Sequence, residues 1–152
     1  MIDEQKPKKE AWSSYPETVL VFAGEPEMMI DLRRPLSPAT KNALKAMGLG
    51  EPFSILTAYN PRGETIAAEE NERRFDELTA ELRSAGIEYL VMDACSPDRS
   101  HCECSVVLKG SRSAAIEIAK RWEQVAIFWY DGGRFWIYGA ISAIEPIPLP
   151  VA

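Results

Sequence analysis

The chain has 152 residues, of which 46% are hydrophobic, and a formal net charge of −6. This length fits one ordinary domain, and the apolar content is high enough for a core, which excludes disorder of the whole chain. The acidic balance argues against general nucleic-acid binding, which needs clustered cations, and no apolar run approaches the twenty or so residues that cross a bilayer.

The N-terminal third alternates short apolar runs with turn signals. Residues 1–15 carry Lys, Glu and Pro without periodicity, which predicts a flexible leader. Proline costs nothing at a first helical position and serine caps free amides, so Ser37-Pro38 predicts a helix start. The predicted elements here are strands at Thr18–Ala23 and Glu27–Leu32, which form a hairpin, and a helix that ends at Gly48 or Gly50.

The rest of the chain predicts strands and helices in the order strand, helix, strand, strand, helix, strand, strand. Glycines stop the helices, and Asp131-Gly132-Gly133 predicts a second hairpin because glycine accepts positive φ. The predicted elements are Pro52–Tyr59, Glu64–Ala85, Ile87–Met92, Cys102–Lys109, Ser111–Glu123, Val125–Tyr130 and Arg134–Ile141.

This order predicts a single α+β domain at 16–145 with an antiparallel sheet and helices on one face. The elements from Phe53 onward follow the ferredoxin-like split βαβ order, to which an N-terminal and a C-terminal hairpin are added. The tail at 146–152 alternates proline with apolar residues, so we expect it to be extended.

Three cysteines and one histidine lie close together in the sequence. Zinc sites usually pair cysteines two to four residues apart on a tight turn, whereas two of these cysteines are separated by a single residue of a predicted strand. We therefore expect no metal, and we expect no cofactor. Because the number of cysteines is odd and we expect a reducing compartment, we also expect free thiols rather than a disulfide. The four residues are Cys95, His101, Cys102 and Cys104.

Alternation along the strand Cys102–Lys109 sorts its side chains onto two faces. The even-numbered residues are cysteine or apolar and predict a core face. The odd-numbered residues begin with His101 and Glu103, which predicts a solvent-facing or site-lining edge. These two residues are candidates for an acid–base pair, although such a pair is also a common exposed neighbour on a strand.

A second group of polar residues joins the end of the strand Pro52–Tyr59 to the helix after it. Asn71 lies one turn before the apolar Phe75, so it is aligned with the buried face of the helix and needs a hydrogen-bond partner. Asparagines also shape turns, so a structural role stays open beside a binding one. The candidates for ligand binding here are Tyr59, Asn60, Asn71 and Arg74.

The last hairpin concentrates aromatic residues on both of its faces. One face must be core, and the other either lies under the leader or the tail or is an interaction surface, for which Trp129 and Trp136 are the candidates. The sequence contains no Gly-rich phosphate loop, no GxSxG, no HExxH and no dinucleotide fingerprint.

Four short motifs carry a family resemblance. Ile55–Pro61 (ILTAYNP), Asn71-Glu72-x-Arg74, His101-x-Glu103-x-Ser105 and Gln124-x-Ala126 resemble a bacterial family catalogued as a domain of unknown function, DUF3293. The resemblance covers Phe53 to Tyr130. It implies a stand-alone bacterial cytosolic domain and adds Gln124 to the ligand-binding candidates, but it implies no activity.

Three functions remain open. The first is a non-catalytic binding module for a protein or a small polar ligand. The second is a small hydrolase or transferase in which Glu103 or His101 acts as acid–base and Arg74 holds an anionic substrate. The third is a phage- or defence-associated partner-binding protein. We expect a cytoplasmic protein that binds neither nucleic acid nor membrane, and its oligomeric state is open.

Overall fold

The computed structural model describes residues 14–151, so all but the last two residues of the predicted leader lie outside it. Eight strands and three α-helices are present in this part of the chain. The strands are β1 (Val19–Phe22), β2 (Met28–Asp31), β3 (Phe53–Thr57), β4 (Leu90–Cys95), β5 (Cys102–Lys109), β6 (Ala126–Tyr130), β7 (Phe135–Gly139) and β8 (Ile147–Pro148). The helices are α2 (Pro38–Ala46), α3 (Ala68–Ser84) and α4 (Arg112–Arg121), with short 3₁₀ turns η1 (Tyr15–Glu17) and η2 (Pro61–Gly63).

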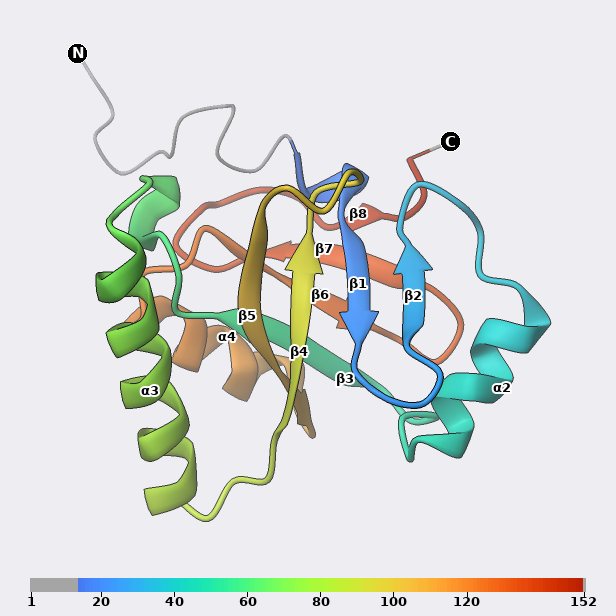
Figure 1. The fold of residues 1–152 in the computed structure, drawn as a ribbon, viewed down its shortest axis with the longest axis horizontal. Coiled ribbons are helices and arrows are strands. Elements are labelled where there is room, and N and C mark those ends of the chain that lie inside the picture. Colours follow the sequence, from blue (N-terminus) through green and yellow to red (C-terminus); the bar gives the residue numbers. More distant parts are fainter. Residues whose placement is uncertain (1–13, 152) are drawn as a thin grey trace.

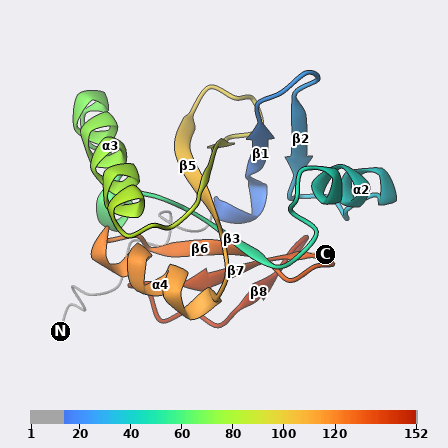
Figure 2. The same cartoon turned by 90° about the horizontal axis from the view of Figure 1, so that it is seen from below.

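All eight strands form one antiparallel sheet in the order β2-β1-β4-β5-β3-β6-β7-β8. The sheet is strongly curled: β2, β1, β4 and β5 form one half, β6, β7 and β8 form the other, and β3 lies at the bend (Figures 1 and 2). The predicted antiparallel sheet and both predicted hairpins, β1–β2 and β6–β7, are therefore confirmed.

The central strands place β5 between β3 and β4, and β6 on the other side of β3. The ferredoxin-like classification of this part stays a prediction. The prediction of a strand at Ile87–Met92 is three residues early, since pairing with β5 runs from Leu90↔Val107 to Cys95↔Cys102. Ile87 and Tyr89 do not join the sheet, and their side chains pack instead against the hydrophobic cluster that helices α3 and α4 form with it.

The curl divides the hydrophobic residues into two cores. On the outer face, α3 and α4 bury Leu78, Leu82 and Ile118 against β3, β5 and β6. On the inner face, alternate residues of the strands form a larger cluster that includes Leu44 of α2. The prediction of helices on one face is thus wrong for α2, because the curl creates a second apolar face that needs its own cover.

Local sequence explains where the helices begin. Ser37 accepts a hydrogen bond from the Thr40 amide at 3.1 Å, and Pro38 follows it as the first helical residue. Ser111 accepts likewise from the Ala114 amide, at 3.0 Å. Helix α3 begins four residues after the predicted Glu64, since η2 and an extended segment intervene.

The tail adds an edge strand to the sheet. Ile147 and Pro148 form β8 and pair with Ile137 and Trp136 of β7. The predicted extended tail thus has a specific place in the fold. No helix in residues 14–151 is long and apolar enough to span a membrane. The cytoplasmic location stays a prediction.

Candidate functional site

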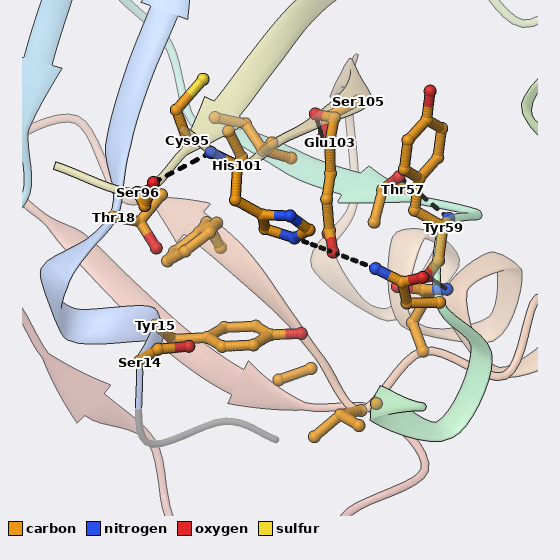
Figure 3. A pocket seen from close by; sticks show the side chains of 18 of the residues that line it. Ser14, Tyr15, Thr18, Thr57, Tyr59, Cys95, Ser96, His101, Glu103 and Ser105 are labelled. Atoms are coloured by element: carbon orange, nitrogen blue, oxygen red, sulfur yellow. Dashed lines mark hydrogen bonds and ion pairs between the residues drawn. The ribbon is translucent and has the colours of Figure 1, made fainter. Parts of the chain in front are cut away.

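A cavity of about 330 Å³ opens at one end of the curled sheet (Figure 3). It lies where β3 ends and where β1, β5 and β6 begin. The inward positions here are Thr18, Thr57, Ser105 and Ala126, which are small or polar, whereas the inward positions further along the same strands are large and apolar. The cavity therefore continues the inner face of the sheet beyond the point where apolar side chains fill it.

Glu103 of β5 is the central charged group of the cavity. One carboxylate oxygen, Oε2, accepts a hydrogen bond from Asn60 Nδ2 at 2.9 Å. The same oxygen lies 3.7 Å from Nε2 of His101, which forms an ion pair with it whenever the imidazole is protonated. The Glu103 side chain is 27% exposed, so it is largely withdrawn from water yet reaches the cavity.

Asn60 is fixed by its own hydrogen bonds. Its backbone is left-handed at φ 46°, a conformation that asparagine tolerates better than most residues. Its Oδ1 accepts from Asn71 Nδ2 at 2.9 Å and from the Ile66 amide at 3.2 Å, while its own amide donates to Asn71 Oδ1 at 2.7 Å. With Oδ1 occupied, Nδ2 is directed at Glu103, so Asn71 positions Asn60 and Asn60 positions the carboxylate.

Burial raises the pKa of Glu103 above its ordinary value, and it outweighs the opposing effects of the Asn60 hydrogen bond and the neighbouring His101. A carboxyl group with a raised pKa exchanges a proton more readily near neutral pH than an exposed one does. The same withdrawal from water leaves the carboxylate form in need of a partner of opposite charge. Both properties are typical of functional sites.

Two aromatic rings form an apolar wall of the cavity. Tyr15 of η1 and Phe128 of β6 lie with their centroids 5.4 Å apart and their planes tilted by 35°. The Tyr15 ring extends beneath His101 and Glu103 in Figure 3. Burial, and then the charge of Glu103, raise the pKa of Tyr15 far above its ordinary value, so the phenol stays protonated.

Cys95 and Cys102 form a disulfide, which corrects the prediction of free thiols for these two residues. The sequence argument rested on an expected reducing compartment, whereas the strand register places the two residues directly opposite each other at the end of the β4–β5 hairpin. Cys104 is free. The disulfide uses two of the four side chains considered as metal ligands, and no three His, Cys, Asp or Glu side chains gather as a metal site within residues 14–151.

Two of the predicted ligand-binding residues, Arg74 and Gln124, bond to the protein's own backbone, and a third, Tyr59, lines the cavity but packs its ring against another side chain. Arg74 donates to the carbonyls of Ala58 at 2.6 Å and Trp122 at 2.7 Å, and it does not line the cavity. Gln124 lines the cavity but donates to the carbonyls of Tyr59 and Trp122. The Tyr59 ring packs edge-on against Phe75, on the side of α3. These residues hold the loops around the site.

The two tryptophans of the predicted interaction surface differ in exposure. Trp129 is 9% exposed and lies under the guanidinium of Arg112, 5.4 Å from the ring centroid. Trp136 is half-buried and donates from Nε1 to Asp131 at 2.8 Å. Trp129 therefore offers little surface to a partner. The opposite face of the hairpin is core, as expected, and contains Phe128, Tyr130, Phe135 and Ile137.

Sequence reasoning missed the residues that approach the cavity from the N-terminal segment. Tyr15 and Thr18 lie in or just after the stretch that was interpreted as a leader. The signal that could have identified Thr18 is the alternation in β1, where Leu20 and Phe22 face the inner core and Thr18 shares their face. Tyr15 precedes any strand, so no periodicity placed it.

Residues 56–127 match the model of a family described as a protein of unknown function, DUF3293. The chain contains a DUF3293-like domain. The matched stretch includes Asn60, Asn71 and Glu103, the residues that build and orient the carboxylate, while Tyr15 and Phe128 of the aromatic wall lie outside it. None of the curated proteins compared with this chain matches it.

Proposed function

We propose that this DUF3293-like domain binds a small polar ligand in the cavity at the open end of its curled sheet. The observation that carries the proposal is the Glu103 carboxylate, which lies at a 330 Å³ cavity and is held by Asn60. The volume falls in the range of small-molecule sites, which combine an apolar lining with a few oriented polar groups.

The cost of this arrangement supports a binding role. Placing a carboxylate partly out of water disfavours its charged form, and a purely structural position could hold a neutral residue more cheaply. The Asn71–Asn60 pair that orients Glu103 uses one buried and one partly buried amide side chain to hold a single orientation. Groups that are positioned at such a cost are typical of sites rather than of scaffolds.

A fragment screen followed by two-dimensional ¹H–¹⁵N NMR tests the proposal. We expect at least one small polar fragment to shift the amide resonances of lining residues such as Thr18, Glu103 and Phe128. Ala94→Phe, which adds a ring at an inward position beside the cavity, should abolish those shifts. The matched variant Ala80→Phe, on the exposed side of α3, should preserve them. Fragments that shift only distant residues, or none at all, would overturn the proposal.

A second candidate function is acid–base catalysis by Glu103 and His101. It is favoured by the raised pKa of Glu103 and by the 3.7 Å approach of the imidazole. The geometry does not support the anionic substrate expected for such an enzyme, because Arg74 is bonded to backbone carbonyls away from the cavity. Assays against uncharged amides and esters, with Glu103→Gln and His101→Gln as variants, test it: turnover should vanish in both, and turnover that persists in both contradicts it.

A further inference from the structure

Among residues 14–151, the permanent charges that line the cavity are negative. Its lining contains two carboxylates, Glu103 and Glu17, and the single imidazole of His101. Of the lysines and arginines in residues 14–151, none lines it. A ligand with a negative charge would meet repulsion from the two carboxylates, with no lysine or arginine of residues 14–151 in the lining to offset it. A positive ligand would find the partner that a partly buried carboxylate needs.

One oxygen of the Glu103 carboxylate, Oε1, is available to a ligand. Both protein contacts of the carboxylate, to Asn60 and to His101, fall on Oε2. Oε1 accepts no hydrogen bond from residues 14–151, and it is not among the buried side-chain atoms without a partner, so it is accessible. An ionised carboxylate has about four lone-pair sites. Oε1 is thus a positioned acceptor that is open to a donor in the cavity.

The aromatic wall of the cavity also favours a positively charged ligand. Faces of tyrosine and phenylalanine rings attract a cation within about 6 Å of the ring centroid, most strongly where water is excluded. Tyr15 and Phe128 provide two such rings on one side of the cavity, and Ile55 and Val125 add apolar surface. A divalent metal ion, in contrast, needs several oxygen ligands together.

We propose that the ligand is a small organic cation, a protonated amine with an apolar body, whose ammonium group donates to Glu103 Oε1 while its body lies against Tyr15 and Phe128. This inference rests on the proposed function and gives it a ligand class. The ammonium charge then balances the negative charge of Glu103, and the hydrogen bond from Asn60 holds the carboxylate in the orientation that the ammonium group needs.

Three probes that share one apolar body separate charge from shape. Benzylamine is cationic, benzyl alcohol is neutral and benzoate is anionic. We expect benzylamine, titrated at pH 7 and followed by the amide resonances of lining residues, to bind at least about tenfold more tightly than benzyl alcohol, because a charge-assisted hydrogen bond to a withdrawn carboxylate is stronger than a neutral one. Benzoate should bind most weakly of the three.

Matched variants assign the preference to Glu103. Glu103→Gln keeps an acceptor for Asn60 and removes the charge, so it should lower benzylamine affinity about tenfold and leave benzyl alcohol unchanged. Glu117→Gln, at an exposed position of α4, should change neither affinity. Amide spectra of both variants must show the native fold before affinities are compared. Unchanged benzylamine affinity in Glu103→Gln would overturn the inference.

The pH dependence gives an independent readout. The groups that face Glu103 are His101, Tyr15, Asn60 and, at the rim, Glu17. Benzylamine affinity should fall as the pH is lowered through the Glu103 pKa, and the same fall should persist in His101→Gln. If none of the three probes shifts the lining residues but another polar fragment does, only this inference fails; if no fragment shifts them, the proposed function fails as well. If benzyl alcohol or benzoate binds as tightly as benzylamine, the cavity remains a binding site and only the cation preference is overturned.

Discussion

The two ends of the inner face of the sheet are built by the same strands but differ in chemistry. At the end near α2, Phe53, Tyr130 and Phe135 pack ring against ring, with centroids 4.9–5.8 Å apart. At the other end, the inward positions of β3 and β5 are Thr57, Ser105 and Glu103. One end is closed by apolar packing, and the other is held open around a carboxylate.

This difference separates stability from function within a single face. Apolar burial supplies the folding free energy at the closed end. At the open end, a disulfide and a network of asparagine hydrogen bonds hold the chain in place without filling the space. Substitutions at the closed end should therefore cost the most folding stability. At the open end, loss of the disulfide or of the asparagine bonds should cost less stability, and substitution of Glu103 should change binding more than folding.

The largest effect is expected at the closed end. Phe53 is fully buried, so Phe53→Ala should lower the free energy of unfolding by about 3–5 kcal/mol through lost burial and the cavity that remains. Urea denaturation measures it. A loss below about 1 kcal/mol would contradict the assignment of this end as the stabilising core.

Asn60→Ala should have the next largest effect, about 2–3 kcal/mol. It removes the acceptor of the Nδ2 group of the buried Asn71. It also leaves a residue with a Cβ atom at positive φ without the side-chain hydrogen bonds that offset the cost of this conformation. Asn60→Gly removes the side chain but accepts the backbone, so it should recover about 1 kcal/mol of this loss in the same denaturation experiment. Equal losses in both variants would show that the left-handed backbone carries no cost.

The disulfide at the open end should contribute about 2 kcal/mol, since it closes a short loop between Cys95 and Cys102. Adding a reductant to the wild-type protein should lower its stability by this amount. The variant Cys104→Ser should respond to the reductant equally, while Cys95→Ala/Cys102→Ala should not respond. Stability that is independent of reductant in the wild type would contradict the pairing.

The smallest effect on stability is expected for Glu103→Gln, and its size depends on pH. Because burial raises the folded pKa of Glu103 above the unfolded value, ionisation favours the unfolded state, and stability is lost as the pH rises from the unfolded pKa through the folded one. The variant should thus match the wild type below pH 4 and be equally or more stable at pH 7. Destabilisation at pH 7 would show that the carboxylate is a structural partner.

The sequence predicted those parts of the fold that depend on local pattern. Alternation in β5 correctly placed Glu103 and Ser105 on the face opposite Val106 and Leu108, and the Ser37 cap marked the start of α2. The curl of the sheet was not predictable in this way, because it depends on pairings between strands far apart in the sequence, such as those of β3 with β5 and β6. That curl brings Tyr15 and Phe128 to the carboxylate.

The polar residues of the candidate site show the same limit. Residue type identified Asn60, Asn71 and Arg74 as side chains that need partners, and all three have them. Which partner each one takes depends on three-dimensional placement, and so Arg74 proved to bind backbone carbonyls while Asn60 binds Glu103. The disulfide was missed because composition was weighed above the register that opposes Cys95 and Cys102.

The most direct test of the account is the titration of the Glu103 carboxyl group by ¹³C NMR, without and with benzylamine. The account predicts a pKa above the ordinary glutamate value in the free protein, because the group is withdrawn from water at the cavity, and a lower pKa when the amine is bound. An ordinary pKa that benzylamine does not change would contradict the central claim that this carboxylate serves a ligand site.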